Sequence, residues 1–133
     1  MPDQAFFDTN VLLYALAEDG WRTPRADVLL AGGGTISVQV LNEFAAVARR
    51  KLRLDWLVIA ALLARARVLC SSVVPLTVEM HEAALVLAGR YQFSFYDALI
   101  VAAAQASGCT ILWSEDMQDG MVVGVHGITY TAF

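Results

Sequence analysis

Four acidic side chains stand in apolar surroundings, at positions spread over almost the whole chain. They are Asp8, Glu43, Asp97 and Asp116. A carboxylate buried without a partner is costly and tends to become neutral, so four of them near one core require a cation between them. Mg²⁺ and Mn²⁺ prefer oxygen ligands, and they can acidify bound water and polarise a phosphodiester oxygen. The four acids therefore predict a metal site with a hydrolytic role.

The first two acids differ in how well local structure explains them. Asp8 directly follows the apolar run 5–7, and its side chain could simply bond the backbone of a strand-to-helix turn. Glu43 lies on an apolar helical stripe, with Val40 and Val47 on the same face and no basic residue three or four positions away. A solvated surface charge is therefore a poor explanation of Glu43.

The last two acids have stronger local alternatives. Asp97 follows Ser94 by three positions, which resembles a capping box, yet it also continues into an apolar stripe. Asp116 lies in an acidic turn with Glu115 and Asp119, and only one or two of these three need take part in chemistry. Spacing alone leaves the choice between Asp116 and Asp119 open.

Other catalytic arrangements find no support in the chain. His81 is expected on a helix surface and His126 lies near the tail, and neither has the spacing of a zinc site. No serine lies in a nucleophile-elbow motif. Gly32, Gly33 and Gly34 are not followed by the Lys-Ser/Thr pair of a phosphate-binding loop.

Apolar runs and capping residues predict strands that alternate with helices. The expected strands are 5–7, 35–36, 72–75, 109–113 and one or two within 122–130. The expected helices are 11–17, one from 23 to the glycines at 32–34, 38–50, 56–68, 78–90 and 95–106. This order predicts a parallel sheet covered on both faces, with ligands at the carboxyl ends of the strands. Asp8 and Asp116 both lie just past such an end.

The bulk composition limits the class of protein. A length of 133 residues suits a single domain over 1–133, and 58% apolar against 17% charged residues leaves apolar surface for partners. The longest clean apolar run, 57–64, is too short to cross a membrane. The start, 1–4, lacks the basic flank of a signal peptide, so a cytoplasmic protein is expected. Cys70 and Cys109 then fit buried, reduced thiols.

The net charge of −4 opposes nucleic-acid binding by bulk electrostatics. Bound metal would neutralise several negative charges, and six of the nine basic residues cluster in the middle of the chain. The cluster consists of Arg49, Arg50, Lys51, Arg53, Arg65 and Arg67. A solvated connection between helices and a nucleic-acid contact both remain open for it.

Four segments carry a resemblance to a known family. They are FFDTNVL at 6–12, ISVQVLNEF at 36–44, FSFYDALIVAAA at 93–104 and LWSEDMQDG at 112–120. Each is weak alone, but their order and spacing over essentially the full length are specific. The chain resembles PIN-domain ribonucleases, and closely the VapC-type toxins of bacterial toxin–antitoxin pairs.

The resemblance implies a three-layer α/β/α sandwich with a central, mainly parallel sheet. It implies endoribonuclease activity, in which water activated by Mg²⁺ or Mn²⁺ hydrolyses an RNA phosphodiester. The implied acidic quartet, catalytic and metal-binding, is Asp8, Glu43, Asp97 and Asp116. The residues implied to orient it are Thr9, Asn10 and Ser114, with Asp119 as an auxiliary acid.

The resemblance also implies partners. Besides the RNA substrate, these are a cognate antitoxin and a second copy in a homodimer, with no membrane association. Trp21 and the run 56–59 are candidate interface residues, although core packing is the favoured use for most of them. The tail 129–133 departs from the family pattern because it lacks an expected Asn-Pro pair.

Three alternatives compete with the nuclease. A haloacid-dehalogenase-type phosphotransferase would use Asp8 as nucleophile, but it usually has a second acid where this chain has Asn10, and its catalytic lysine could only be Lys51. A receiver-type signalling domain that binds Mg²⁺ also needs an early acid pair and a late lysine. A PIN fold kept only for binding is the third alternative, and the complete quartet opposes it.

Overall fold

The computed structural model describes residues 4–17, 23–115, 122–123 and 128–131. Within them, six strands form one sheet in the order β3-β2-β1-β4-β6-β5. The strands are β1 (Ala5–Phe7), β2 (Thr35–Ser37), β3 (Ser72–Val74), β4 (Ile111–Trp113), β5 (Val122–Val123) and β6 (Ile128–Thr131). Only the β5–β6 pair is antiparallel, so the predicted mainly parallel sheet is confirmed.

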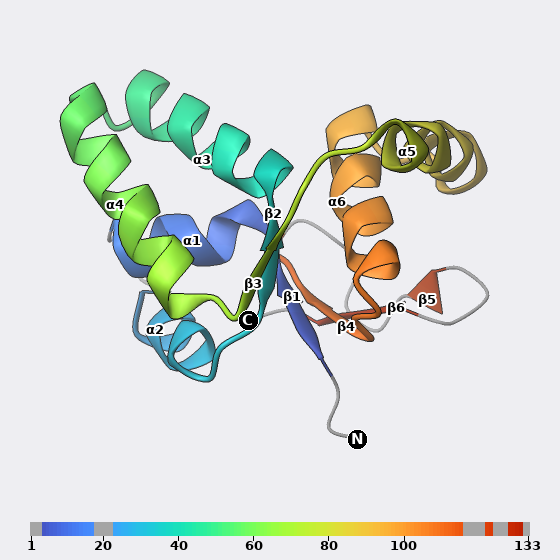
Figure 1. The fold of residues 1–133 in the computed structure, drawn as a ribbon, viewed down its shortest axis with the longest axis horizontal. Helices are drawn as coiled ribbons and strands as arrows, with labels where there is room; N and C mark the ends of the chain where they lie inside the picture. Colours follow the sequence, from blue (N-terminus) through green and yellow to red (C-terminus); the bar gives the residue numbers. More distant parts are fainter. Residues whose placement is uncertain (1–3, 18–22, 116–121, 124–127, 132–133) are drawn as a thin grey trace.

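Helices cover both faces of this sheet (Figure 1). They are α1 (Thr9–Leu16), α2 (Thr23–Ala31), α3 (Val38–Arg50), α4 (Trp56–Leu69), α5 (Val78–Tyr91) and α6 (Phe95–Ala106). Figure 1 shows α1 to α4 on one side of the sheet and the α5–α6 pair on the other. The predicted three-layer α/β/α sandwich is therefore confirmed.

Side-chain caps begin several helices where the sequence predicts them. The Ser37 hydroxyl accepts a hydrogen bond from the Val40 amide at 3.3 Å, and the Thr77 hydroxyl accepts one from the Met80 amide at 3.1 Å. The first helix begins at Thr9, two residues before its predicted start. It begins there because the preceding acid, rather than a later residue, caps it.

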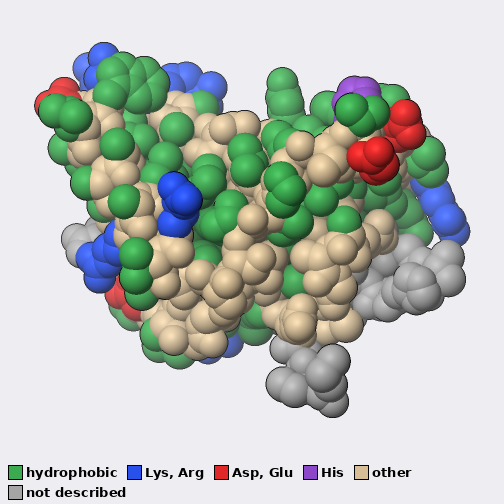
Figure 2. All heavy atoms as spheres, viewed as in Figure 1, with side chains coloured by type: hydrophobic (Ala, Val, Ile, Leu, Met, Phe, Trp, Pro, Cys, Tyr) green, Lys and Arg blue, Asp and Glu red, His purple; other side chains and the backbone are tan. Residues whose placement is uncertain are grey.

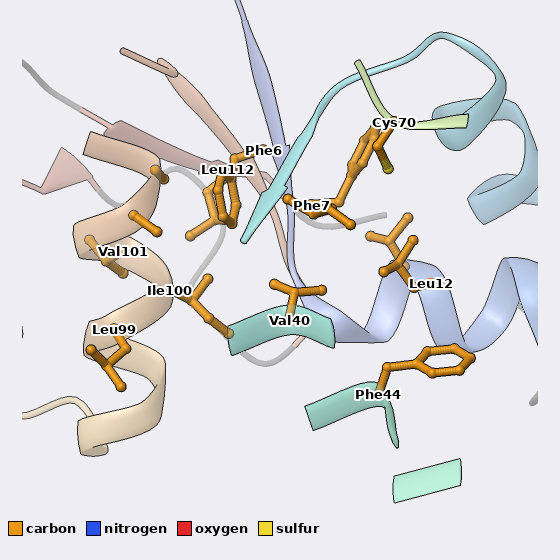
Figure 3. Packing of buried hydrophobic residues seen from close by; sticks show 14 of the residues in the cluster. Phe6, Phe7, Leu12, Val40, Phe44, Cys70, Leu99, Ile100, Val101 and Leu112 are labelled. Carbon is orange, nitrogen blue, oxygen red and sulfur yellow. The ribbon is translucent and has the colours of Figure 1, made fainter. Parts of the chain in front are cut away.

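The core fills the space on both sides of the sheet. Successive side chains of a strand point to opposite faces, and Figure 3 shows Phe6 beside Leu112 near α6 whereas Phe7 points to the other side, towards Cys70. All four are buried, as is Val40 on α3. The burial of these apolar side chains on both faces of the sheet holds β1 and β4, and therefore their carboxyl ends, in place.

Gly34 permits a close approach between the β2 and β1 segments. A Cβ atom at this position would lie 2.6 Å from Phe7 Cε2 and 3.0 Å from the Ala5 carbonyl oxygen. No side chain fits in that space without moving the Phe7 ring. The last glycine of the run at 32–34 therefore allows β1 to pack closely, whereas Gly32 and Gly33 follow the end of α2, where their amides donate to the Leu29 and Leu30 carbonyls.

The surface of α4 corrects one expectation about packing. Trp56, Leu57 and Val58 are 60%, 85% and 44% exposed, and only Ile59 of this run is buried. The prediction that most of this run packs in the core is therefore wrong for Trp56, Leu57 and Val58, because only one narrow face of α4 packs against the rest of the fold. Figure 2 shows hydrophobic and basic side chains interspersed over α4, whereas acidic side chains and a histidine gather over α5. Trp21 lies outside the described residues.

Other expectations about single residues hold. Cys70 and Cys109 are free and buried, as predicted for reduced thiols. Burial raises the pKa of the Cys70 thiol to about 11. His81 is exposed on α5, and His126 lies outside the described residues. In the part of the chain that the structure describes, no helix combines the length and the apolar character needed to cross a bilayer.

Candidate active site

The register of β1 and β4 places the first acid of the site. Phe7 and Trp113 are partners at the carboxyl ends of these parallel strands. The next residues are therefore neighbours: the Asp8 amide donates to the Trp113 carbonyl at 3.0 Å, and the Ser114 hydroxyl donates to Asp8 Oδ2 at 2.7 Å. Asp8 Oδ1 accepts a hydrogen bond from the Thr9 amide at 2.7 Å. Both oxygens of this buried carboxylate are thus held in place.

Glu43 reaches the same strand ends from the middle of α3. Its Oε2 accepts a hydrogen bond from the Thr9 hydroxyl at 2.7 Å, and its Oε1 accepts a weak one from Gln39 Nε2 at 3.4 Å. Thr9 therefore contacts two acids at once, Asp8 through its backbone and Glu43 through its side chain. Glu43 is half-buried, as the apolar stripe of its helix predicts.

Asp97 comes from the first turn of α6. Its amide donates to the Ser94 hydroxyl at 3.2 Å, which confirms the predicted cap. The side chain nevertheless lines the same cavity as Asp8 and Glu43, so the capping geometry also aims this acid at the site. The cavity has a volume of about 640 Å³. Its lining residues are Asp8, Thr9, Asn10, Leu13, Tyr14, Glu43, Ala46, Val47, Arg50, Lys51, Tyr96, Asp97 and Glu115.

Glu115, which the sequence indicated only as one of three acids in the turn after β4, also lines this cavity. The Tyr14 hydroxyl donates to its Oε2 at 2.6 Å, and Asn10 Nδ2 donates to the same oxygen at 3.2 Å. The predicted fourth acid, Asp116, and its alternative Asp119 both lie outside the described residues. An acid of the turn after β4 does line the cavity, but the spacing of acids within the turn does not indicate which side chain faces α1.

The electrostatics of the cavity favour a bound cation. Burial raises the pKa of the Asp8 carboxyl to about 7, because a charge is poorly solvated there. Hydrogen bonds from Ser114 and Thr9 oppose this rise, and the nearby charges of Asp97 and Glu43 add to it. A cation placed among these acids would offset both the poor solvation of the Asp8 charge and its repulsion by Asp97 and Glu43.

The donor set matches a hard divalent ion. Every candidate ligand is a carboxylate, hydroxyl or amide oxygen, which Mg²⁺ and Mn²⁺ prefer over nitrogen or sulfur. Among the described residues, no three acidic, histidine or cysteine side chains are already spaced to enclose an ion. Mg²⁺ usually keeps several waters and binds through one or two carboxylates, so this open arrangement fits it.

Sequence comparison identifies the family. The model of the PIN domain matches residues 5–118, which include β1 to β4, α1 to α6 and the acids of the cavity, Asp8, Glu43, Asp97 and Glu115. The chain belongs to the PIN domain family. This match confirms the resemblance that the four sequence segments indicated. PIN domains of the VapC type are nucleases, which hydrolyse phosphodiester bonds. No functionally curated protein matches its sequence.

Solved structures share the PIN fold. The sarcin–ricin loop cleaving toxin VapC20 of Mycobacterium tuberculosis has 23% sequence identity and a TM-score of 0.68, over 82% of this chain and 87% of that one. A toxin–antitoxin complex from Klebsiella pneumoniae has 23% identity and a TM-score of 0.61, over 85% and 87%. DNA-bound VapBC from Salmonella typhimurium has 14% identity and a TM-score of 0.62, over 98% of both chains. At these identities the likeness establishes the PIN fold.

Proposed function

We propose that this chain is a metal-dependent endoribonuclease that acts as the toxin of a toxin–antitoxin pair. The observation that carries the proposal is the convergence of Asp8, Glu43 and Asp97 on one cavity, at the carboxyl edge of a PIN-domain sheet. These acids come from three separate elements, and the cavity has no comparable histidine, cysteine or serine among the described residues that line it. A metal-assisted hydrolysis is the chemistry that such a set supports best.

The acids would hold the ion and their neighbours would orient them. Asp8, Asp97, Glu43 and Asp116 are the proposed catalytic ligands. Mg²⁺ or Mn²⁺ bound there would polarise the phosphodiester and lower the pKa of the attacking water. The proposed orienting residues are Thr9, Ser114 and Asn10, with Asp119 as an auxiliary acid.

The hydrogen bonds support these orienting roles. Thr9 fixes the spacing between Asp8 and Glu43, and Ser114 fixes Asp8 from the neighbouring strand. Asn10 holds Glu115 instead of a member of the quartet, so its role is to position a further acid at the edge of the cavity. Such supporting contacts affect metal affinity and activity by about 10–100-fold in comparable sites.

A protein partner is also part of the proposal. The neighbouring structures include a toxin–antitoxin complex and a VapBC assembly. An antitoxin, a second copy in a homodimer, or both would cover the exposed apolar side chains of α4, Trp56, Leu57 and Val58. The proposed single domain over 1–133, a cytoplasmic location and the RNA substrate are parts of the same proposal.

The decisive experiment is cleavage of RNA by the purified, partner-free chain. RNA should be cut with Mn²⁺ or Mg²⁺ and remain intact with a chelator, and Asp97→Asn should abolish cutting. Equal cleavage by Asp97→Asn and wild type would refute the ligand assignment. Expression alone should slow bacterial growth, and Asp8→Ala should relieve the effect. Equal toxicity of the two proteins would refute the toxin role.

One observation keeps the phosphotransferase alternative in the test. Lys51, the only lysine of the chain, lines the cavity that contains Asp8. Incubation with acetyl phosphate followed by intact-mass measurement separates the two chemistries, because a nuclease of this kind should gain no phosphoryl group. An increment on Asp8 would favour the phosphotransferase or receiver alternatives.

A further inference from the structure

The face of α3 that presents Glu43 continues into basic residues. Glu43, Ala46, Val47, Arg50 and Lys51 all line the cavity. Their positions are i, i+3, i+4, i+7 and i+8, the spacing of one continuous helix face. With a rise of 1.5 Å per residue, Arg50 lies about 10 Å along the axis from Glu43. The acidic and basic ends of this stripe therefore border one cavity.

The central basic cluster of the sequence is divided by the fold. Arg49 turns away from the cavity: its Nη1 donates to the carbonyl of Leu54 in the α3–α4 connection at 3.1 Å, and its guanidinium lies 5.2 Å from the centre of the Trp56 ring at the start of α4. Arg67 lines a different hollow, beside Cys70. Arg50 and Lys51 are the basic residues that line the acidic cavity, among those the structure describes.

An aromatic ring stands on the opposite, α6 side of the cavity. Tyr96 directly precedes Asp97, lines the cavity and is 61% exposed. Its ring meets Phe95 edge-on at a centroid distance of 6.0 Å, which supports it from one side. An exposed aromatic beside a basic stripe is the combination that binds single-stranded nucleic acid, by stacking on a base and by pairing with phosphates.

We propose that Arg50 and Lys51 bind phosphates of a single-stranded RNA next to the linkage that is cut, and that Tyr96 stacks on one of its bases. The proposal rests on the proposed ribonuclease function and specifies how that site takes its substrate. The net charge of −4 makes local cations necessary, because the molecule as a whole repels RNA. These residues position the strand, whereas the acids act on the scissile linkage.

A simpler role for the two basic residues gives a different expectation. Cations near the end of α3 also suit the helix dipole, and Arg50 lies in its last turn. Removing charges that serve only the dipole would lower thermal stability and leave RNA affinity unchanged. The two roles are therefore distinguished by measuring binding and stability on the same variants.

The test is binding of a labelled single-stranded RNA oligonucleotide, followed by fluorescence anisotropy over a series of KCl concentrations. All variants carry Asp97→Asn, so that the RNA is not consumed, and Mg²⁺ is present throughout. Arg50→Gln/Lys51→Gln should reduce the slope of log affinity against log salt by about 1.4, since each lost phosphate contact contributes about 0.7. Arg65→Gln/Arg67→Gln, a matched loss of two exposed charges outside the cavity, should leave the slope nearly unchanged.

Stacking gives a second, salt-independent signal. Tyr96→Ala should weaken binding by about tenfold at every salt concentration with the slope retained, and Tyr96→Phe should bind like the parent. A wild-type slope for the Arg50/Lys51 double variant, or an equal reduction of the slope in the Arg65/Arg67 double variant, overturns the phosphate assignment. Unchanged binding by Tyr96→Ala overturns the stacking assignment. If the wild-type chain still cuts RNA in either case, the proposed nuclease stands and only the positioning roles fail.

Discussion

Asp8→Asn should stabilise the metal-free protein while it abolishes the proposed metal site. Asp8 is 3% exposed and burial raises its pKa from 3.8 to about 7. Because the folded state binds this proton more tightly, the stabilising contribution is complete below about pH 4 and is lost as the pH rises to about 7. At 1.36 kcal/mol per pKa unit, the shift corresponds to an upper limit of roughly 4 kcal/mol at neutral pH and above.

The asparagine amide can keep both hydrogen bonds of the carboxylate without its charge. Its oxygen can accept from the Thr9 amide, and its NH₂ group can donate to the Ser114 hydroxyl, which is also an acceptor. Allowing for imperfect replacement, we expect a gain of about 2 kcal/mol at about pH 8 in chelator, equal to roughly 6 °C in the unfolding midpoint. The gain should vanish at about pH 4, where wild-type Asp8 is protonated.

Thermal unfolding of both proteins across this pH range is the assay. Added Mg²⁺ or Mn²⁺ should raise the midpoint of wild type in proportion to the logarithm of its concentration, and should have little effect on Asp8→Asn. The order of stability therefore reverses at high metal. A variant that is less stable than wild type at about pH 8 in chelator, or that keeps the wild-type pH dependence, would refute the assignment of the burial cost to Asp8.

Three further outcomes test separate features. Gly34→Ala should lower the free energy of unfolding by about 1–3 kcal/mol through its clash with Phe7. Gly89→Ala, whose added Cβ meets nothing within 4 Å beyond the nearby backbone of its own helix, should be neutral or stabilising in a denaturant titration. Tyr14→Phe should reduce cleavage about tenfold with little change in midpoint, since it releases a carboxylate at the cavity edge; unchanged cleavage contradicts that role. Leu57→Asp should weaken self-association or antitoxin binding, measured by light scattering and calorimetry, and leave cleavage intact.

The sequence predicts most of the framework because its local signals agree with the fold. Apolar runs mark the strands, and Ser37, Thr77 and Ser94 begin their helices as predicted. Asp8 stands at the carboxyl end of a strand, where a parallel sheet binds ligands. Asp97 belongs both to a cap and to the cavity, so a local explanation and a functional one can hold for the same residue.

What the sequence leaves open depends on contacts between distant segments. The hydrogen bond between Tyr14 and Glu115 joins residues that lie 101 positions apart, and no local pattern encodes it. The exposure of Leu57 likewise depends on which face of α4 the rest of the fold covers. The division of the basic cluster between the cavity and the start of α4 depends on how α3 packs against distant elements, because the end of α3 at Arg50 is as predicted.

The pairing of β1 with β4 joins segments that are synthesised at opposite ends of translation. Asp8 emerges first from the ribosome, but its hydroxyl partner, Ser114, directly follows β4, a strand made near the end of the chain. Asp97 also arrives late, on α6. In a growing polypeptide, the acids therefore remain apart until most of the chain has been synthesised. The cavity lined by Asp8, Glu43 and Asp97 can therefore form only after α6 has been synthesised.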